Sequence, residues 1–189
     1  MRRIIAIVCL SLLCSSPVFA AATRGPATNN YEIEVLIFEV KQPELEGSEV
    51  WTRDGTRPID TSGAIPAGAA PVATELSATA AALRGDGRYR VLLHKRWAQN
   101  AEAKSSARPV LLSSGDKELD GTLKFYLSRF LHVELALAFQ PALTQASTEG
   151  TSQYQINEQR RIKTQELHYF DHPKFGALVR ISPQRTTTR

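Results

Sequence analysis

The chain has 189 residues, 42% of them hydrophobic, which is enough for one domain with a substantial core. It carries 23 basic and 19 acidic residues, a formal net charge of +4. This basic excess is too small to favour nucleic acid as a partner. After the N-terminal segment, no stretch approaches the roughly 18 apolar residues of a membrane-spanning helix.

The N-terminal segment, MRRIIAIVCLSLLCSSPVFA (1–20), has the pattern of a secretory signal peptide. Arg2 and Arg3 form a charged start, and the apolar run from Ile4 to Leu13 is too short to span a bilayer. Val18 and Ala20 fit the small-residue pattern that precedes a cleavage site. We therefore expect export and cleavage after Ala20, which leaves no transmembrane anchor.

Both cysteines, Cys9 and Cys14, lie inside this segment. Val8 and Leu13 precede them where a lipoprotein needs a small residue, so we expect no lipid anchor. The mature chain would then have no disulfide, no thiol nucleophile and no thiolate metal site. Its fold must be held together by burial alone.

After a flexible segment over residues 21–30, the sequence YEIEVLIFEV (31–40) alternates and predicts a β-strand. Apolar residues form one face at its start, while Glu32 and Glu34 form the other. Two carboxylates at this spacing would suit glycoside hydrolysis, but we favour a solvated strand face. Residues 41–71, rich in Pro, Gly and small polar residues, predict a long mobile loop.

The sequence ATELSATAAALRGDG (73–87) predicts a helix that is capped by Thr74 and ended by a left-handed Gly85. The next stretch, RYRVLLHKRW (88–97), alternates and predicts a strand with an apolar face and a basic, solvent-exposed face. The apolar face holds Tyr89, Val91, Leu93 and Trp97, and the basic face holds Arg88, Arg90, His94 and Arg96. A mobile connector is expected near 98–108, followed by a short strand at VLLS.

The longest regular pattern, GTLKFYLSRFLHVELALAF (121–139), would make a straight strand of roughly 60 Å, longer than a domain of this size. We therefore expect it to bend or fold back at Ser128-Arg129. A mobile loop near 140–153, a strand over 154–170, a last strand over 175–182 and a disordered tail over 183–189 follow. Together these elements predict a single α+β domain over residues 31–182, mainly antiparallel β-sheet with one or two covering helices.

The stretch ELHYFDHPKFGALVRI (166–181) raises the question of a metal or catalytic site. On a helix, His168 and His172 would point towards one ion, with Asp171 beside them. However, Pro173 disfavours helical backbone at His172, and in a strand the two imidazoles would lie about 13 Å apart. We favour a tight turn, in which Asp171 accepts local backbone hydrogen bonds and Gly176 relieves the exit.

Positive charge collects near the C-terminus, where residues 154–189 include seven basic and three acidic residues. We predict a binding site for an acidic sugar–peptide polymer, formed by Arg160, Arg161, Lys163, His168 and Tyr169 through charge and stacking. The alternative is a solvated strand. The chain contains no Gly-x-Ser-x-Gly elbow and no glycine-rich phosphate loop, so we assign no catalytic residue and no cofactor.

Four stretches resemble, in order, the CsiV family of periplasmic proteins: YEIEVLIFEV (31–40), YRVLLHKRW (89–97), LDGTLKFYLSRFLHVELAL (119–137) and RRIKTQELHYFDHPKFGALVRI (160–181). Family members usually continue the second stretch into Trp-x-Gln-Pro, where this chain has Trp97-Ala98-Gln99-Asn100. The resemblance implies a non-enzymatic periplasmic protein that binds peptidoglycan. It also implies that the protein supports a penicillin-binding-protein synthase together with its lipoprotein activator.

Two other functions stay open at this point. One is a metal-dependent periplasmic hydrolase that uses His168, Asp171 and His172. The other is an envelope scaffold without contact to the wall polymer.

Overall fold

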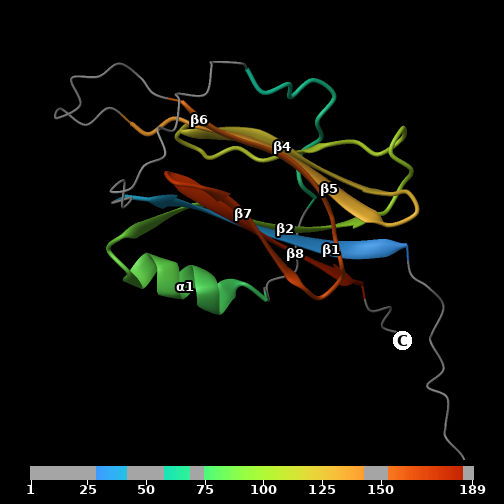
Figure 1. Ribbon diagram of the computed structural model, residues 1–189, viewed down its shortest axis with the longest axis horizontal. Helices are drawn as coiled ribbons and strands as arrows, with labels where there is room; N and C mark the ends of the chain where they lie inside the picture. Colours follow the sequence, from blue (N-terminus) through green and yellow to red (C-terminus); the bar gives the residue numbers. More distant parts are fainter. Residues whose placement is uncertain (1–28, 42–57, 69–74, 143–152, 185–189) are drawn as a thin grey trace, which may run out of the picture.

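The computed structural model describes residues 29–41, 58–68, 75–142 and 153–184. These residues form two four-stranded antiparallel sheets, stacked face to face, with one helix on the outer face of one sheet (Figure 1). The elements are β1 (Asn30–Val40), α1 (Ser77–Gly85), β2 (Tyr89–Asn100), β3 (Val110–Leu111), β4 (Leu119–Leu127), β5 (Leu131–Phe139), β6 (Tyr154–Arg161), β7 (Leu167–His172) and β8 (Phe175–Pro183). The predicted class, mainly antiparallel β-sheet with a covering helix, is confirmed.

The first sheet, sheet A, has the strand order β2-β1-β8-β7, and the second, sheet B, has the order β3-β4-β5-β6. One apolar core fills the space between them, because alternate residues of both sheets point inwards. Its members include Ile33, Val35, Ile37, Leu123, Phe125, Val133, Leu135, Phe170, Val179 and Ile181, each fully buried. Burying one such side chain stabilises the fold by about 1.5–3 kcal/mol.

A bulge in β2 changes the face on which its side chains lie. Ile37 of β1 pairs with Leu93, but the next residue, Phe38, pairs with Val91, so Leu92 has no partner on β1. Leu93 therefore packs in the core between the sheets, while Val91 packs on the helix side. The prediction that Val91 and Leu93 share one face is wrong, because an extra residue reverses the two-residue period.

Helix α1 lies across the outer face of sheet A, where Leu76 and Ala80 pack on Leu36 of β1. The predicted cap, Thr74, is outside the described residues, and Leu76 occupies the N-cap position without a side-chain cap. Gly85 belongs to the helix and does not have a positive φ, and the residue after it has extended backbone. The prediction of a left-handed end at Gly85 is therefore wrong.

A strand residue takes over the capping of this helix. Glu34, which we expected to be solvated, is 3% exposed. Its carboxylate accepts hydrogen bonds from the backbone N–H groups of Glu75 (2.8 Å) and Leu76 (3.1 Å) and lies 2.6 Å from Nε2 of His94. A negative charge at a helix N-terminus is stabilising, so β1 anchors α1 through this side chain as well as through the apolar contact.

The long alternating stretch folds back where we expected. β4 ends at Leu127 and pairs with β5 from Leu131 onwards, and Ser128 donates its N–H to the carbonyl of Phe130 (3.0 Å). By contrast, the strand predicted over 154–170 is two strands in different sheets. The chain crosses from β6 to β7 at residues 162–166, with Gln165 at φ +65°, a conformation uncommon for residues other than glycine.

The stretch around Pro173 is a hairpin turn, as predicted, with β7 and β8 paired up to His172 and Phe175. The details differ. The backbone N–H of Lys174 bonds to Nδ1 of His172 (3.1 Å), whereas Asp171 accepts the hydroxyl of Tyr169 (2.7 Å).

Gly176 provides room rather than backbone freedom. A Cβ atom there would lie 2.7 Å from the Tyr169 ring and 3.0 Å from Phe38, and these two rings stack on each other. The glycine is therefore required by side-chain packing on the outer face of sheet A.

Parts of the expected organisation fall outside the described residues: the signal peptide, most of the segment at 21–30, and most of the loops near 41–71 and 140–153. In the region expected to be a connector at 98–108, β2 continues to Asn100 before the chain leaves the sheet. At the other end, β8 reaches Pro183, and Gln184 donates its N–H to the carbonyl of Asn30 (2.9 Å).

Candidate functional site

The structure does not bring the five predicted binding residues onto one face. Arg161 is on the outer face of sheet B, where it lies over Phe130, with 3.5 Å between its guanidinium carbon and the ring centroid. Tyr169 is on the outer face of sheet A, stacked on Phe38. The other three, Arg160, Lys163 and His168, lie along the edge where β6 meets β7. The five residues are therefore divided among three surfaces.

The residues of that edge are also engaged with each other. Arg160 bonds to Glu158 (2.7 Å) and to the carbonyl of Tyr169 (2.5 Å). Nζ of Lys163 lies 3.4 Å from the carboxylate of Glu166, and Nε2 of His168 lies 3.1 Å from the carbonyl oxygen of Lys163. These contacts hold the open side of the sandwich together, and a binding role for the five residues remains a prediction.

The histidines near the last turn are likewise separated from their aspartate. Along β7, His168 and His172 share the inward face with buried Phe170, while Asp171 is on the opposite face and bonds to Tyr169. His172 packs against Tyr154 and Phe175. Within the described ranges, no group of three His, Cys, Asp or Glu side chains is arranged to hold a metal ion.

A polar cleft of about 510 Å³ lies near the start of α1. Its charged side chains pair with each other: Glu32, which we expected to be solvated, bonds to Arg96, and Glu75 bonds to Arg180. Both pairs connect the helix or β1 to neighbouring strands. This arrangement stabilises the fold and leaves the cleft without free charges for a ligand.

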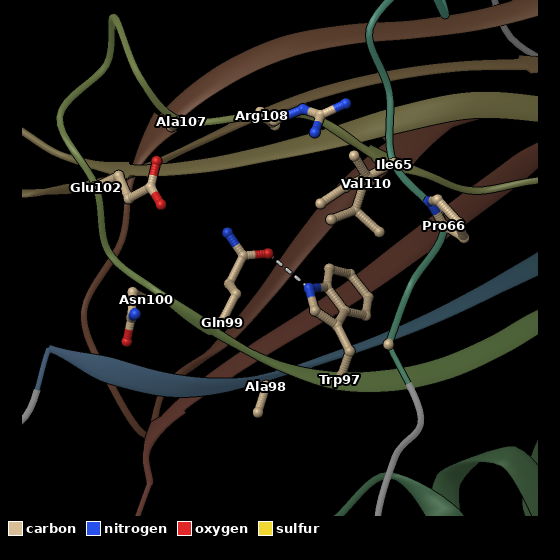
Figure 2. Close-up of a pocket in the computed structure, with 11 residues that line it drawn as sticks. Ile65, Pro66, Trp97, Ala98, Gln99, Asn100, Glu102, Ala107, Arg108 and Val110 are labelled. Carbon is tan, nitrogen blue, oxygen red and sulfur yellow. Dashed lines mark hydrogen bonds between the residues drawn. The ribbon is translucent and has the colours of Figure 1, made fainter.

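A better candidate for a binding site lies between β2 and β3, at the edge of the sandwich opposite to the β6–β7 edge. This Trp97 pocket has a volume of about 310 Å³, within the range of small-ligand sites (Figure 2). Its floor is apolar and buried, made by Trp97, Ala107 and Val110, with Ile65 beside them. Ile65 is held there because its N–H donates to the Pro109 carbonyl (2.9 Å), which adds the segment 58–68 to sheet B.

The rim of the Trp97 pocket carries hydrogen-bonding groups. Trp97 and Gln99 point to the same side because they are two residues apart in β2, and the indole N–H donates to the Gln99 amide oxygen (2.6 Å; Figure 2). That bond uses the oxygen of the Gln99 amide and leaves its NH₂ group for a ligand. Asn100 also borders the pocket at the end of β2, but strand alternation turns its side chain to the other side, with Ala98, so Gln99 supplies the amide on this side.

Two charges of opposite sign complete the rim. Glu102 and Arg108 are exposed on the loop that faces Gln99 (Figure 2). Among the described residues, the Glu102 carboxylate has no hydrogen-bond or ion-pair partner, and the one hydrogen bond of the Arg108 side chain is a long one, 3.4 Å, to the carbonyl of Gly63. An apolar floor with an amide and both charges suits a ligand with peptide character and both an amine and a carboxylate.

A family model described as "Peptidoglycan-binding protein, CsiV" matches residues 55–184, more than two thirds of the chain. The chain belongs to the CsiV family. Searches of curated proteins and of solved structures gave no match. The resemblance noted from the sequence is thereby confirmed, and the matched region includes the whole Trp97 pocket.

Sequence reasoning missed this pocket although one signal was present. The stretch that resembles the CsiV family ends at Trp97, and Trp97 and Gln99 are the two side chains joined by the indole–amide hydrogen bond. Glu102 and Arg108 lie in a region that looked like a featureless connector. Their position opposite Gln99 depends on the pairing of β2 with β1 and of β3 with β4, which local sequence does not reveal.

Within the described residues, no helix is long and apolar enough to cross a membrane.

Proposed function

We propose that this protein is a non-enzymatic peptidoglycan-binding protein of the periplasm. The observation that carries the proposal is the match to a peptidoglycan-binding family over residues 55–184. Export through a cleavable signal peptide, suggested by the N-terminal sequence, would deliver the protein to the compartment that holds this polymer.

The Trp97 pocket is the site that we assign to the wall polymer. Peptidoglycan combines N-acetylated sugars with short peptides that carry free amines and carboxylates. The amide of Gln99 matches its acetamido and peptide groups, and Glu102 and Arg108 match the two charges of a peptide end. Since the indole N–H is already bonded to Gln99, Trp97 would act by shaping the floor.

The resemblance to the CsiV family also supports a more specific role. We propose that the protein assists a penicillin-binding-protein synthase together with its lipoprotein activator, and that it adds no catalytic step of its own. Co-purification of the synthase with the tagged protein from cross-linked envelopes would support this part. Retention of the synthase by a tagged periplasmic control protein at the same level would count against it.

Sedimentation with purified sacculi tests the binding proposal directly. The mature protein should pellet with sacculi in a saturable manner, and an Arg108→Ala variant should pellet less. Arg84→Ala is a suitable control, because it removes an exposed arginine from the last turn of α1, and Arg84 does not line the pocket. Wild-type retention no greater than that of an unrelated protein of similar charge would refute peptidoglycan binding, and release of soluble fragments would refute the non-enzymatic role.

A further inference from the structure

The outer face of sheet B carries a second concave surface. Helix α1 covers sheet A, and no described helix covers sheet B; of the described segments, residues 58–68 pass over part of sheet B (Figure 1). Strand register places side chains from β4, β5 and β6 side by side in rows on this face. One row consists of the small or short residues Thr122, Ala136 and Asn157.

This row is the floor of a trough between higher walls. Lys124, Glu134 and Gln159 form the adjacent row on one side, and residues 58–60 rise on the other. Two hollows, of about 280 Å³ and 260 Å³, share Ala136 and Asn157 and therefore adjoin each other along this row; we refer to them together as the trough. They cross three strands, β4, β5 and β6, a span of about 10 Å, and continue to Pro109, which suits an elongated ligand better than a compact one.

The lining of the trough is polar but nearly free of unpaired charge. Glu134 is neutralised by Lys104 at 2.5 Å, and the Gln159 amide donates to the Tyr126 hydroxyl (2.8 Å), which keeps its oxygen as an acceptor. In the part of the chain that the structure describes, the exposed amide of Asn157 has no hydrogen-bond partner. Amides and a small-residue floor are suited to hydroxyl and acetamido groups, and among the described lining residues the charges without an ion-pair partner are Lys124 on one wall and Asp60 on the other, which are of opposite sign.

One end of the trough adjoins the Trp97 pocket. Pro109 borders the trough, while its chain neighbours Arg108 and Val110 border the pocket. Since consecutive Cα atoms lie about 3.8 Å apart, the two sites meet at residues 108–110, next to the bridge between Ile65 and Val110.

We propose that the trough binds the uncharged glycan backbone of peptidoglycan, a chain of N-acetylated amino sugars, and that the peptide branch enters the Trp97 pocket. This inference rests on the proposed function and divides it into two adjacent subsites. The glycan subsite lies on the outer face of sheet B, on the opposite side of the sandwich from helix α1.

Titration with chitotetraose, the N-acetylglucosamine tetramer, tests the glycan subsite without any peptide. In nuclear magnetic resonance spectra of the mature protein, amide shifts should collect at Thr122, Ala136 and Asn157. Ala136→Leu fills the floor and should weaken binding about tenfold, whereas Ala81→Leu, on the exposed face of α1, should leave it unchanged. Asn157→Ala removes an exposed amide without disturbing the core and should weaken binding about fivefold.

The two proposals fail in different ways. If sacculi retain the wild-type protein but chitotetraose causes no shifts, or causes shifts away from the trough, the glycan subsite is refuted and peptidoglycan binding stands. Unchanged affinity in both Ala136→Leu and Asn157→Ala would refute it equally. If sacculi do not retain the wild-type protein, the proposed function fails, and this inference fails with it.

Discussion

Replacement of Glu34 by glutamine tests the account of how β1 holds the helix. The carboxylate accepts two backbone N–H groups, from Glu75 and Leu76, and touches the His94 ring, all within 3.1 Å. Glutamine has nearly the same shape but only one acceptor oxygen. Whichever way its amide is turned, its NH₂ group must face at least one of these backbone donors, so either the partly buried N–H of Glu75 or the buried N–H of Leu76 loses its partner.

The expected cost follows from that lost bond. A hydrogen bond to a charged group contributes about 1.5–3 kcal/mol, and an NH₂ group turned towards the N–H that has lost its partner adds somewhat to that cost. We therefore expect Glu34→Gln to lower the free energy of unfolding by about 2–4 kcal/mol. For a domain of this size, that corresponds to a Tm decrease of roughly 4–16 °C.

Thermal unfolding followed by circular dichroism measures the effect, with Glu102→Gln as the matched control. Glu102 is exposed and should change stability by less than about 0.5 kcal/mol. Hydrogen exchange should also become faster in α1 before it changes in β4 and β5. A Tm for Glu34→Gln equal to that of Glu102→Gln would refute the capping role of this carboxylate.

Three further predictions concern glycines and a tyrosine. Gly176→Ala should destabilise the fold by about 1–3 kcal/mol in chemical denaturation, since the new methyl group meets the Tyr169 ring at 2.7 Å; an unchanged midpoint would contradict this packing. Gly121→Ala should be more damaging, because its Cβ would lie 2.2 Å from a backbone oxygen of β5, and soluble expression with wild-type stability would contradict the register. Burial and the hydrogen bond to Asp171 raise the pKa of Tyr169 above its ordinary value of 10.0. The unfolded phenol ionises first, so stability should fall as the pH rises above about 10, and should fall less in Tyr169→Phe, as measured by denaturation at increasing pH.

Several features of the fold could be predicted because they depend on local pattern. Alternation located β1, β4, β5 and β8, and the excessive length of the 121–139 stretch predicted the reversal after Leu127. Proline at position 173 located the last turn. In each case, the physical signal is contained in fewer than twenty consecutive residues.

The features that could not be predicted depend on long-range pairing. The bulge opposite Ile37 reverses the faces of β2, and nothing in the local sequence marks it. The crossing between β6 and β7 is made without glycine or proline, through Gln165 at positive φ. Glu34 looked like a surface residue because its partners are more than forty positions away.

The same limit applies to the candidate site. The basic residues at 160–163 were predicted to form one binding site because they cluster in sequence, but the structure spreads their side chains over different surfaces. The Trp97 pocket combines residues from β2, the loop after it and the segment 58–68, which meet only through sheet pairing.

Titration of the isotope-labelled mature protein with a soluble muropeptide, a sugar unit that keeps its peptide, tests the central claim most directly. We predict amide shifts at Gln99, Glu102 and Arg108, reduced binding in Arg108→Ala, and few shifts along the β6–β7 edge. Shifts centred instead on Arg160, Lys163 and His168, with Arg108→Ala binding like wild type, would contradict the assignment of the Trp97 pocket.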